Sequence, residues 1–205
     1  MNQAMNVAPL KRTDKKRAAL AVANAFFDYP SLKAYFPNPV SRKWKLPWYM
    51  EHVLNSALKY GEVLTTEDLS GVLFLLPPGH TRLTDWEYIK CGFLAAPIVV
   101  GIRRYAFVND SETFLAEQQE KLTQGRPHYY LWGIAVDPSR QRTGAGTALL
   151  NTLFDKADRE GMPVYLETHQ LANVAYYEQR GFRLVHTGEM PGDHLPFWCM
   201  LREAR

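Results

Sequence analysis

The chain has 205 residues, of which 46% are hydrophobic and 22% are charged. This composition supplies a hydrophobic core and excludes a disordered protein, because disorder accompanies low hydrophobicity and high net charge. The net charge of +3 at pH 7 is too small for the dense basic surface of a nucleic-acid-binding protein. The most apolar stretch, residues 93–102, is shorter than the ~20 residues that cross a bilayer. We therefore predict one α/β domain over residues 1–205, with no nucleic acid and no membrane among its partners.

The start of the chain and its two cysteines favour a cytoplasmic protein. Residues 1–16 have no apolar segment, so they do not resemble a secretion signal, and residues 1–10 are predicted to be disordered. Cys91 and Cys199 lack the close spacing of a metal site or a redox pair, which indicates free thiols in a reducing compartment. No cluster of histidine, cysteine and aspartate has the spacing of metal ligands, so we expect no metal ion.

The first half of the chain predicts helices and one β-hairpin. Thr13 and Asp14 can cap the first helix, whose inner face carries Leu20, Ala23 and Phe27. The predicted elements, in chain order, are a helix over 15–28, a loop with short helical turns over 31–47, a helix over 48–60, strands over 62–66 and 70–76, and mostly helical structure over 84–121 that is interrupted near 97–101. The apolar residues 93–102 predict either a buried helix end or a patch beside a substrate or homodimer surface.

A strand, a glycine-containing turn and a helix follow one another between residues 131 and 161. The apolar strand ends at Val136, the turn reads Q-R-T-G-A-G over 141–146, and the helix is expected to end at Gly161 in a left-handed cap. This order leaves several backbone N–H groups at the helix start unpaired and directed at one point, which attracts a phosphate. The helix is expected to bury one apolar face, made of Leu149, Leu150, Leu153, Phe154 and Ala157.

The spacing of the glycines excludes two common phosphate sites. The dinucleotide fingerprint G-x-G-x-x-G fails because Leu149 stands at the third glycine position, and the Gly-Lys-Ser/Thr run of a P-loop is absent. Taken alone, Q-x-x-G-x-G also fits an ordinary turn that uses glycine for its backbone angles. The turn is therefore judged together with the segment that follows it.

The following segment reads as a strand over 164–168, a short helix over 173–180 closed by Gly181-Phe182, and a strand over 183–187. With the turn, the order Q-x-x-G-x-G, L-E-T and N-x-x-x-Y-E-x-x-G-F resembles the GNAT superfamily of acetyl-CoA-dependent N-acetyltransferases. The motifs lie within residues 130–185. Within the superfamily the chain is most similar to the puromycin N-acetyltransferases and their bacterial relatives, with further similarity in A-F-F-D-Y-P at 25–30 and W-C-M at 198–200.

This resemblance implies a fold and a co-substrate site. The fold is a central mixed, mostly antiparallel sheet with a splayed parallel strand pair and helices on both faces. Acetyl-CoA enters between the splayed strands, which agrees with ligand binding at strand ends in open α/β sheets. The implied acetyl-CoA contacts are Ile134, Ala135, Val136, Gln141, Arg142, Thr143, Gly144, Ala145, Gly146, Thr147 and Asn173. Family members often have a small residue in place of Arg142, whose side chain here either contacts a phosphate or lies solvated in the turn.

Tyr177 lies four residues before Gly181, where the resemblance places a general acid. A phenol with a pKa near ~10 stays protonated at neutral pH and can donate a proton to the CoA thiolate. Tyr176 is the competing candidate, because only one of two neighbouring helix positions can face the thioester, and packing is the alternative role for either. Asn173 is open between a contact with CoA and a helix N-cap.

Glu167 is the group predicted to orient or deprotonate the amine. Alternation along the strand puts it on the opposite face from Leu166. Burial would have to raise its pKa from the ordinary value near ~4.3, and a structural carboxylate is the alternative. His169 and His128 are further candidates for this role. A backbone N–H of Ala135 or Val136 is expected to stabilise the oxyanion.

These features predict direct transfer of the acetyl group of acetyl-CoA to a primary amine of a small molecule. The aromatic-rich residues 26–48 and the residues 86–100 are expected to form the walls of a pocket for a planar or apolar amine. Two other functions fit the same sequence. One is a non-catalytic acyl-CoA sensor or partner subunit, and the other is an acetyltransferase for protein amines.

Overall fold

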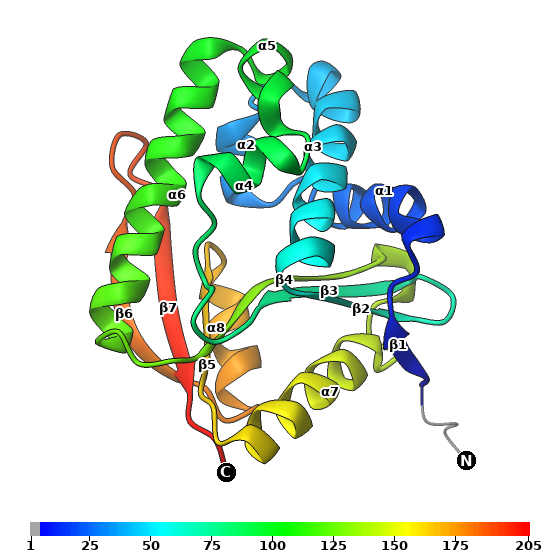
Figure 1. Cartoon of the computed structure of the whole chain (residues 1–205), viewed down its shortest axis with the longest axis vertical. Helices are drawn as coiled ribbons and strands as arrows, with labels where there is room; N and C mark the ends of the chain where they lie inside the picture. Colours follow the sequence, from blue (N-terminus) through cyan, green and yellow to red (C-terminus); the bar gives the residue numbers. More distant parts are fainter. Residues whose placement is uncertain (1–4) are drawn as a thin grey trace.

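The computed structural model describes residues 5–205 and contains a seven-stranded sheet with the order β1-β2-β3-β4-β5-β7-β6 (Figure 1). The strands are β1 Val7–Pro9, β2 Glu62–Thr66, β3 Gly71–Leu76, β4 Tyr129–Val136, β5 Val164–Thr168, β6 Arg183–Glu189 and β7 Pro196–Arg202. All neighbouring strands are antiparallel except β4 and β5, which are parallel. The predicted mixed, mostly antiparallel sheet with one parallel pair is confirmed.

Strands β4 and β5 separate after two residue pairs. Tyr129 pairs with Val164 and Tyr130 with Tyr165, and no later pair joins the two strands. On its other edge, β4 has a bulge against β3, because two residues of β4 lie between the pairs Phe74–Gly133 and Leu76–Tyr130 where β3 has one. A bulge bends its strand and increases the local twist. The predicted splay is confirmed, and it leaves the facing edges of β4 and β5 without strand partners.

Helices cover both faces of the sheet. In Figure 1, α7 lies below β2–β4 and α1 and α3 lie above them, while α6 runs down the left side beside β6 and β7. The helices are α1 Lys15–Ala25, α2 Pro30–Tyr35, α3 Pro39–Tyr60, α4 Asp85–Lys90, α5 Ala96–Val100, α6 Ile102–Thr123, α7 Ala145–Glu160 and α8 Leu171–Glu178, with the short 3-10 turns η1 Arg12–Asp14, η2 Phe93–Ala95 and η3 Pro138–Arg140. Each face therefore has its own core, and a gap in the sheet connects the two.

The face of α7 predicted from periodicity is the buried one. Leu149, Leu150, Leu153 and Ala157 are fully buried and Phe154 nearly so, and they pack against the inner residues of β2, β3 and β5. Burial of each large apolar side chain contributes roughly 1.5–3 kcal/mol. Gly161 ends the helix in the left-handed conformation, with φ of +66°, as predicted. This packing fixes the start of α7 against the end of β4.

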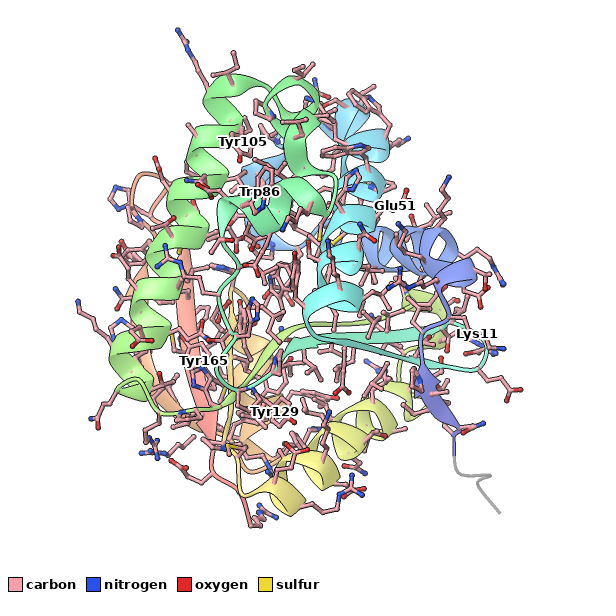
Figure 2. All side chains as sticks on the ribbon, viewed as in Figure 1. Lys11, Glu51, Trp86, Tyr105, Tyr129 and Tyr165 are labelled. Atoms are coloured by element: carbon pink, nitrogen blue, oxygen red, sulfur yellow. The ribbon has the colours of Figure 1, made fainter. Side chains whose placement is uncertain are left out.

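The opposite face has cores under α1 and α3 and under α6. Figure 2 shows the side chains between the sheet and these helices, with Tyr165 near the lower part of α6. Tyr165 is fully buried beside Tyr130 and Leu115. The predicted hairpin over 62–76 and the interrupted helical segment over 84–121 are confirmed, with the interruption at Gly101 in a left-handed conformation.

Several sequence predictions for the first half are wrong in detail. The first helix ends at Ala25, and Leu20 is half exposed while Ala18, Ala19 and Val22 are buried in its place. Residues 39–47 form the first part of α3 rather than a loop. Asn38 caps this helix by accepting hydrogen bonds from the N–H groups of Val40 and Ser41. Burial of Leu46 outweighs the helix-breaking tendency of Pro47.

Three further expectations concern the chain start, the apolar segment and the cysteines. Residues 7–9 form β1, so the predicted disorder of residues 1–10 is wrong there, and residues 1–4 lie outside the described part of the chain. Segment 93–102 buries Phe93, Ala96 and Val100 but exposes Leu94, Ile98 and Ile102, so it is a surface patch rather than a buried helix end. A homodimer stays a prediction. Both cysteines are free and buried, and residues 5–205 contain no helix long and apolar enough to span a membrane.

Candidate functional site

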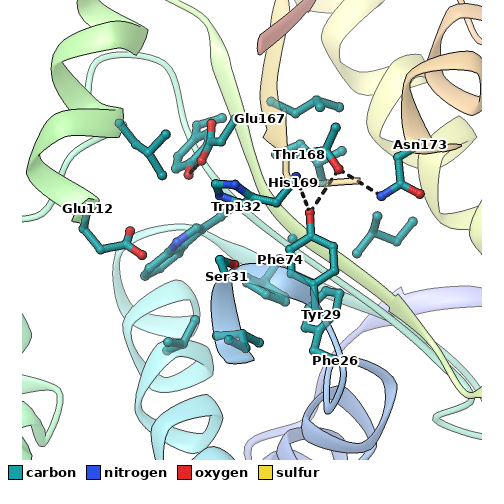
Figure 3. Close-up of a pocket in the computed structure, with 18 of the residues that line it drawn as sticks. Phe26, Tyr29, Ser31, Phe74, Glu112, Trp132, Glu167, Thr168, His169 and Asn173 are labelled. Carbon is teal, nitrogen blue, oxygen red and sulfur yellow. Dashed lines mark hydrogen bonds between the residues drawn. The ribbon is translucent and has the colours of Figure 1, made fainter. Parts of the chain in front are cut away.

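A pocket lies in the gap where β4 and β5 separate (Figure 3). We call it the splay pocket. Its walls are residues 131–134 of β4, residues 166–169 at the end of β5, Asn173 and Tyr177 of α8, Phe26 and Tyr29 before α2, and Glu112 of α6. Its volume is about 130 Å³, close to the ~150 Å³ of an engineered cavity that binds benzene. The pocket therefore has room for about one ring beside the strands.

Glu167 lies in this pocket, on the strand face opposite Leu166 as predicted. Leu166 packs toward α7, whereas the Glu167 carboxylate accepts a hydrogen bond from the hydroxyl of Tyr130. Burial raises the pKa of Glu167 to about 8, with the Tyr130 hydrogen bond acting in the opposite direction and the charge of Glu112 adding to the rise. The condition set by the sequence analysis, a raised pKa, is thus met. A carboxylate of this pKa is a suitable proton acceptor near neutral pH.

Glu112 is a second carboxylate in the splay pocket, and the sequence analysis missed it. It comes from the middle of α6 and accepts a hydrogen bond of 3.0 Å from the hydroxyl of Tyr35. Burial raises its pKa above the ordinary range, while the Tyr35 hydrogen bond favours the charged form. In Figure 3, the two carboxyl groups lie near Trp132, with Glu112 on the side of α6 and Glu167 on β5. No spacing in the sequence marks Glu112, because it is one polar residue among many in a long helix.

The two neighbouring tyrosines of α8 point to different places. Tyr177 is buried and lines the splay pocket, and its hydroxyl has no hydrogen-bond partner among residues 5–205. Burial raises its pKa, so the phenol stays protonated. The Tyr176 hydroxyl instead lies against Gly146, where an added Cβ atom would be 3.0 Å from it. Tyr177 is therefore the tyrosine that faces the gap between the strands.

Thr168 is the centre of a hydrogen-bond network at the end of β5. Its Oγ1 atom lies 3.0 Å from the Tyr29 hydroxyl and accepts a hydrogen bond of 2.9 Å from Asn173 Nδ2. The same Tyr29 hydroxyl accepts a hydrogen bond from the backbone N–H of His169, and Figure 3 shows all three contacts. Asn173 is not an N-cap, since α8 begins two residues earlier with Gln170 before it. This network fixes Asn173 at the pocket wall.

His169 is a further group in the pocket that can accept a proton, besides the two carboxylates. Its Nδ1 atom lies 3.1 Å from the carbonyl oxygen of Pro196. A carbonyl only accepts hydrogen bonds, so Nδ1 carries the proton and Nε2 keeps the lone pair. Burial lowers the pKa of His169 and keeps it neutral. His128 lies outside the pocket, where Gln119 and the Arg126 carbonyl contact its two ring nitrogens.

The turn before α7 offers a row of free backbone donors. No N–H group from residue 142 to residue 147 donates a hydrogen bond within the described chain, and α7 has no side-chain cap. Gly144 has a φ of +94° and no atom within 4 Å of an added Cβ, so the approach to these donors is open. Arg142 has a φ of +64°, in the left-handed region. Family members often have a small residue at this position. Unpaired N–H groups at a helix start are a site for a phosphate.

Arg180 adds a positive charge beside this turn, and the sequence analysis missed it. Its guanidinium stacks 3.5 Å from the centre of the Tyr176 ring and donates a hydrogen bond of 3.2 Å to the Thr147 hydroxyl. Its Nε atom is buried without a hydrogen-bond acceptor. The free donors of the turn and this orphaned nitrogen both fit a phosphate-bearing ligand.

The three strand residues expected to contact CoA lie at different points along β4. Ile134 lines the splay pocket. Ala135 and Val136 do not, and Val136 lies beside Gly146 at the start of α7, 3.6 Å from an added Cβ there. Of β4, residues 130–134 line the same pocket as Tyr177 and Glu167. Contacts of Ala135 and Val136 with the co-substrate stay a prediction.

Comparison with known proteins agrees with this arrangement. The acetyltransferase (GNAT) family model matches residues 70–182, which is more than half of the chain and includes the turn, Glu167 and Tyr177. The chain belongs to the GNAT family of acetyltransferases. It is therefore an enzyme of a family that uses acetyl-CoA as co-substrate. In residues 5–205, no group of three or more histidine, cysteine, aspartate or glutamate side chains is placed to hold a metal ion.

Individual relatives match either most of the chain or a part of it. An uncharacterized N-acetyltransferase of Schizosaccharomyces pombe is 27% identical over 198 residues, covering 93% of this chain and 80% of that protein. The ribosomal protein bS18-alanine N-acetyltransferase of Escherichia coli is 35% identical over 100 residues, covering 39% of this chain and 68% of that protein. A structure from Corynebacterium glutamicum, described as histone acetyltransferase HPA2 and related acetyltransferase, has a TM-score of 0.68 at 20% identity and covers 99% of this chain and 98% of its own. That likeness shows the fold alone.

Proposed function

We propose that this GNAT enzyme acetylates the primary amine of a small molecule with an apolar or aromatic body. The observation that carries the proposal is the pair formed by Glu167 and Tyr177 in the splay pocket. One is a buried carboxylate whose pKa is raised to about 8, and the other is a buried phenol that keeps its proton. A proton acceptor and a proton donor that line one pocket are what amine acetylation requires.

The turn before α7 would hold the co-substrate. Acetyl-CoA supplies a thioester, whose acetyl group an amine can take up directly. The N–H groups of Thr143, Gly144, Ala145, Gly146 and Thr147 would bind the pyrophosphate, with Arg180 beside them. One helix-end interaction contributes only ~0.3–1 kcal/mol, so several donors must act together. The free edge of β4, including Ile134, would bind the amide groups of the pantetheine arm.

Glu167 and Tyr177 would divide the proton transfers. Glu167 takes the proton of the incoming ammonium, so that a neutral nitrogen forms the new N–C bond. As the C–S bond breaks, Tyr177 gives its proton to the sulfur, and the second proton that the nitrogen loses on forming the amide restores the Tyr177 phenol. A backbone N–H group within residues 132–134 that points away from β3 stabilises the developing negative charge on the carbonyl oxygen. His169, with a free Nε2 in the same pocket, is the alternative proton acceptor.

The shape of the splay pocket supports a small acceptor. It is about ring-sized, and the aromatic side chains of Phe26, Tyr29 and Phe74 line it together with Trp132. The similarity to the puromycin N-acetyltransferases places aminonucleosides among the amines to be tested. The rival substrate is a protein amine, which the partial similarity to the bS18-alanine acetyltransferase of Escherichia coli favours. The family match disfavours the non-catalytic acyl-CoA sensor that the sequence left open.

An amine screen with acetyl-CoA, read as thiol release, tests the proposal. We expect aromatic amines such as phenethylamine and puromycin to react faster than aliphatic amines of equal size, and a peptide with an N-terminal alanine to react slowest. Equal rates for aromatic and aliphatic amines would disprove the apolar pocket. A fastest rate for the peptide would establish the protein-amine function.

The variant Tyr177→Phe separates the enzyme from the sensor. The enzyme should lose about 100-fold in kcat, the lower range for general acid catalysis, while its CoA-induced thermal shift persists. Tyr176→Phe is the matched control, because this neighbour faces Gly146 instead of the pocket, and its kcat should change less than the Tyr177 variant's. A wild-type protein that binds CoA but turns over no amine would be a sensor.

A further inference from the structure

Glu112 belongs to the walls of two adjoining cavities. Besides the splay pocket, it lines a cavity of about 80 Å³ between α6, α4 and the segment after β3, which we call the α4–α6 cavity. The two cavities share Glu112, Leu115, Tyr130 and Trp132. Glu167 lines only the splay pocket. Glu112 therefore lies at the border of the two cavities, where a ligand that extends from the splay pocket into the α4–α6 cavity would pass it.

No cation of the protein pairs with Glu112. Within residues 5–205, its carboxylate has the Tyr35 hydrogen bond and no lysine, arginine or histidine within the 4.0 Å of an ion pair. Buried carboxylates in proteins are usually paired, because an unpaired buried charge is costly. A carboxylate that faces open space without a cation is suited to receive one from a ligand.

The reacting nitrogen is a poor partner for Glu112. That nitrogen must lose its proton before it attacks, and in the proposed function Glu167 already accepts the proton. A carboxylate that held the same ammonium would favour its charged form and oppose this step. Aromatic rings around Glu112, those of Tyr35, Trp132 and Tyr88, suit a cation carried on an apolar spacer.

We propose that Glu112 binds a second positive charge on the acceptor, which makes the acceptor a compact diamine with an apolar or aromatic spacer. The inference rests on the proposed function for the role of the first nitrogen. One amine would lie in the splay pocket beside Glu167. The spacer would pass the aromatic rings, and the second ammonium would reach Glu112 at the border of the α4–α6 cavity.

Two amines that differ only in this charge test the inference. They are para-xylylenediamine and para-ethylbenzylamine, in which an ethyl group replaces one aminomethyl group at nearly equal size. The wild-type enzyme should prefer the diamine at least tenfold in kcat/KM, about 1.4 kcal/mol. In Glu112→Gln the preference should fall to about twofold, the statistical factor that two equivalent amino groups give. The amide keeps an oxygen for the Tyr35 hydroxyl, so the fold is preserved.

Glu117→Gln is the matched control. Glu117 lies on the same helix, is exposed and lines neither cavity, so this variant should keep the tenfold preference. Calorimetric binding of both amines to the CoA-loaded protein gives a readout that does not need turnover. The diamine should bind at least tenfold more tightly than the monoamine to the wild type, and only about twofold more tightly to Glu112→Gln, the statistical factor of its two equivalent ends.

The outcomes separate this inference from the proposed function. If neither amine is acetylated but the charge preference in binding depends on Glu112, the proposed function fails and the cation site stands. If both amines are acetylated without preference, or Glu112→Gln keeps the preference, the inference is overturned and the function stands. If Glu112→Gln lowered kcat/KM equally for both amines, Glu112 would act at the reacting nitrogen. That result would also overturn the inference.

Discussion

The wall of the site formed by the turn before α7 consists of backbone groups, whereas the wall toward α6 consists of side chains. On the first wall, the N–H groups of residues 142–147 donate no hydrogen bond within the described chain, and glycine at Gly144 leaves the space beside them open. On the second, Glu112, Tyr35 and Trp132 come from three separate elements. The first wall suits a ligand that every family member shares, since the backbone is common to all sequences. The second can change with each substrate while the fold stays constant.

The largest effect is expected from replacing Glu167, the proposed proton acceptor, which lies between these two walls. We expect Glu167→Gln to lower kcat about 100-fold or more, the usual range for loss of a general base. The rate of the wild type should rise with pH through a limb near pH 8, because Glu167 has a pKa of about 8 and must lose its proton to act. This limb should vanish in the variant. If the wild-type rate instead rose with pH below ~6.5, the ordinary pKa of histidine, His169 would be the proton acceptor.

The same carboxyl makes stability depend on pH. Its folded pKa lies above the unfolded value near ~4.3, so the folded state holds the proton more tightly. The free energy of unfolding should therefore fall as the pH rises from about 4.5 to 8 and level off above. Urea unfolding of Glu167→Gln should show a weaker fall. The difference at pH 8 should be at least the ~1.4 kcal/mol of one pKa unit.

The next effect tests the backbone wall. Gly144→Ala should raise the Kd for CoA about tenfold, because a Cβ at φ of +94° both strains the turn and enters the space before the N–H groups. Gly161→Ala is the control at the other end of α7, where φ is also left-handed and an added Cβ meets no atom within 4 Å. Both variants should lose roughly 1–2 kcal/mol of stability. Equal CoA affinities in the two would contradict the phosphate site.

Tyr130→Phe should have a smaller effect, on the pH profile. The Tyr130 hydroxyl donates to the Glu167 carboxylate and lowers its pKa. Its removal should move the acid limb of kcat/KM upward, by about one pH unit for a lost hydrogen bond of ~1–1.5 kcal/mol. An unchanged limb with a reduced kcat would show that Tyr130 supports the pocket without tuning Glu167.

The smallest effect concerns Arg142. Arg142→Gly removes an exposed cation near the proposed phosphate site and relieves a positive φ. We expect the Kd for CoA to rise two- to threefold at low salt and by less at high salt, as for exposed charges. Stability should increase by up to ~1 kcal/mol, the left-handed strain less the extra entropy of glycine. A CoA affinity that does not change at any salt concentration would leave the arginine solvated in the turn.

The contrast between the two walls also explains which parts of the site can be predicted from the sequence and which cannot. The turn, Gly161, Glu167 and the buried face of α7 are visible because backbone geometry restricts residue types and helix burial has a fixed period. Glu112 and Arg180 leave no such mark, since their roles depend on which elements meet in space. The first part of α3 was missed because Pro39 and Pro47 suggest a break, although proline is favourable in the first helical turn.

The short contact between β4 and β5 has a consequence for the lifetime of the protein. Two residue pairs are all that join strands β1–β4 to strands β5–β7 within the sheet. A molecule lying in the gap would bridge the two parts and couple their unfolding. Because degradation follows the population of opened states, the abundance of this enzyme would follow the supply of its co-substrate. A shortage of CoA and its acetyl thioester would then lower the amount of catalyst as well as its rate.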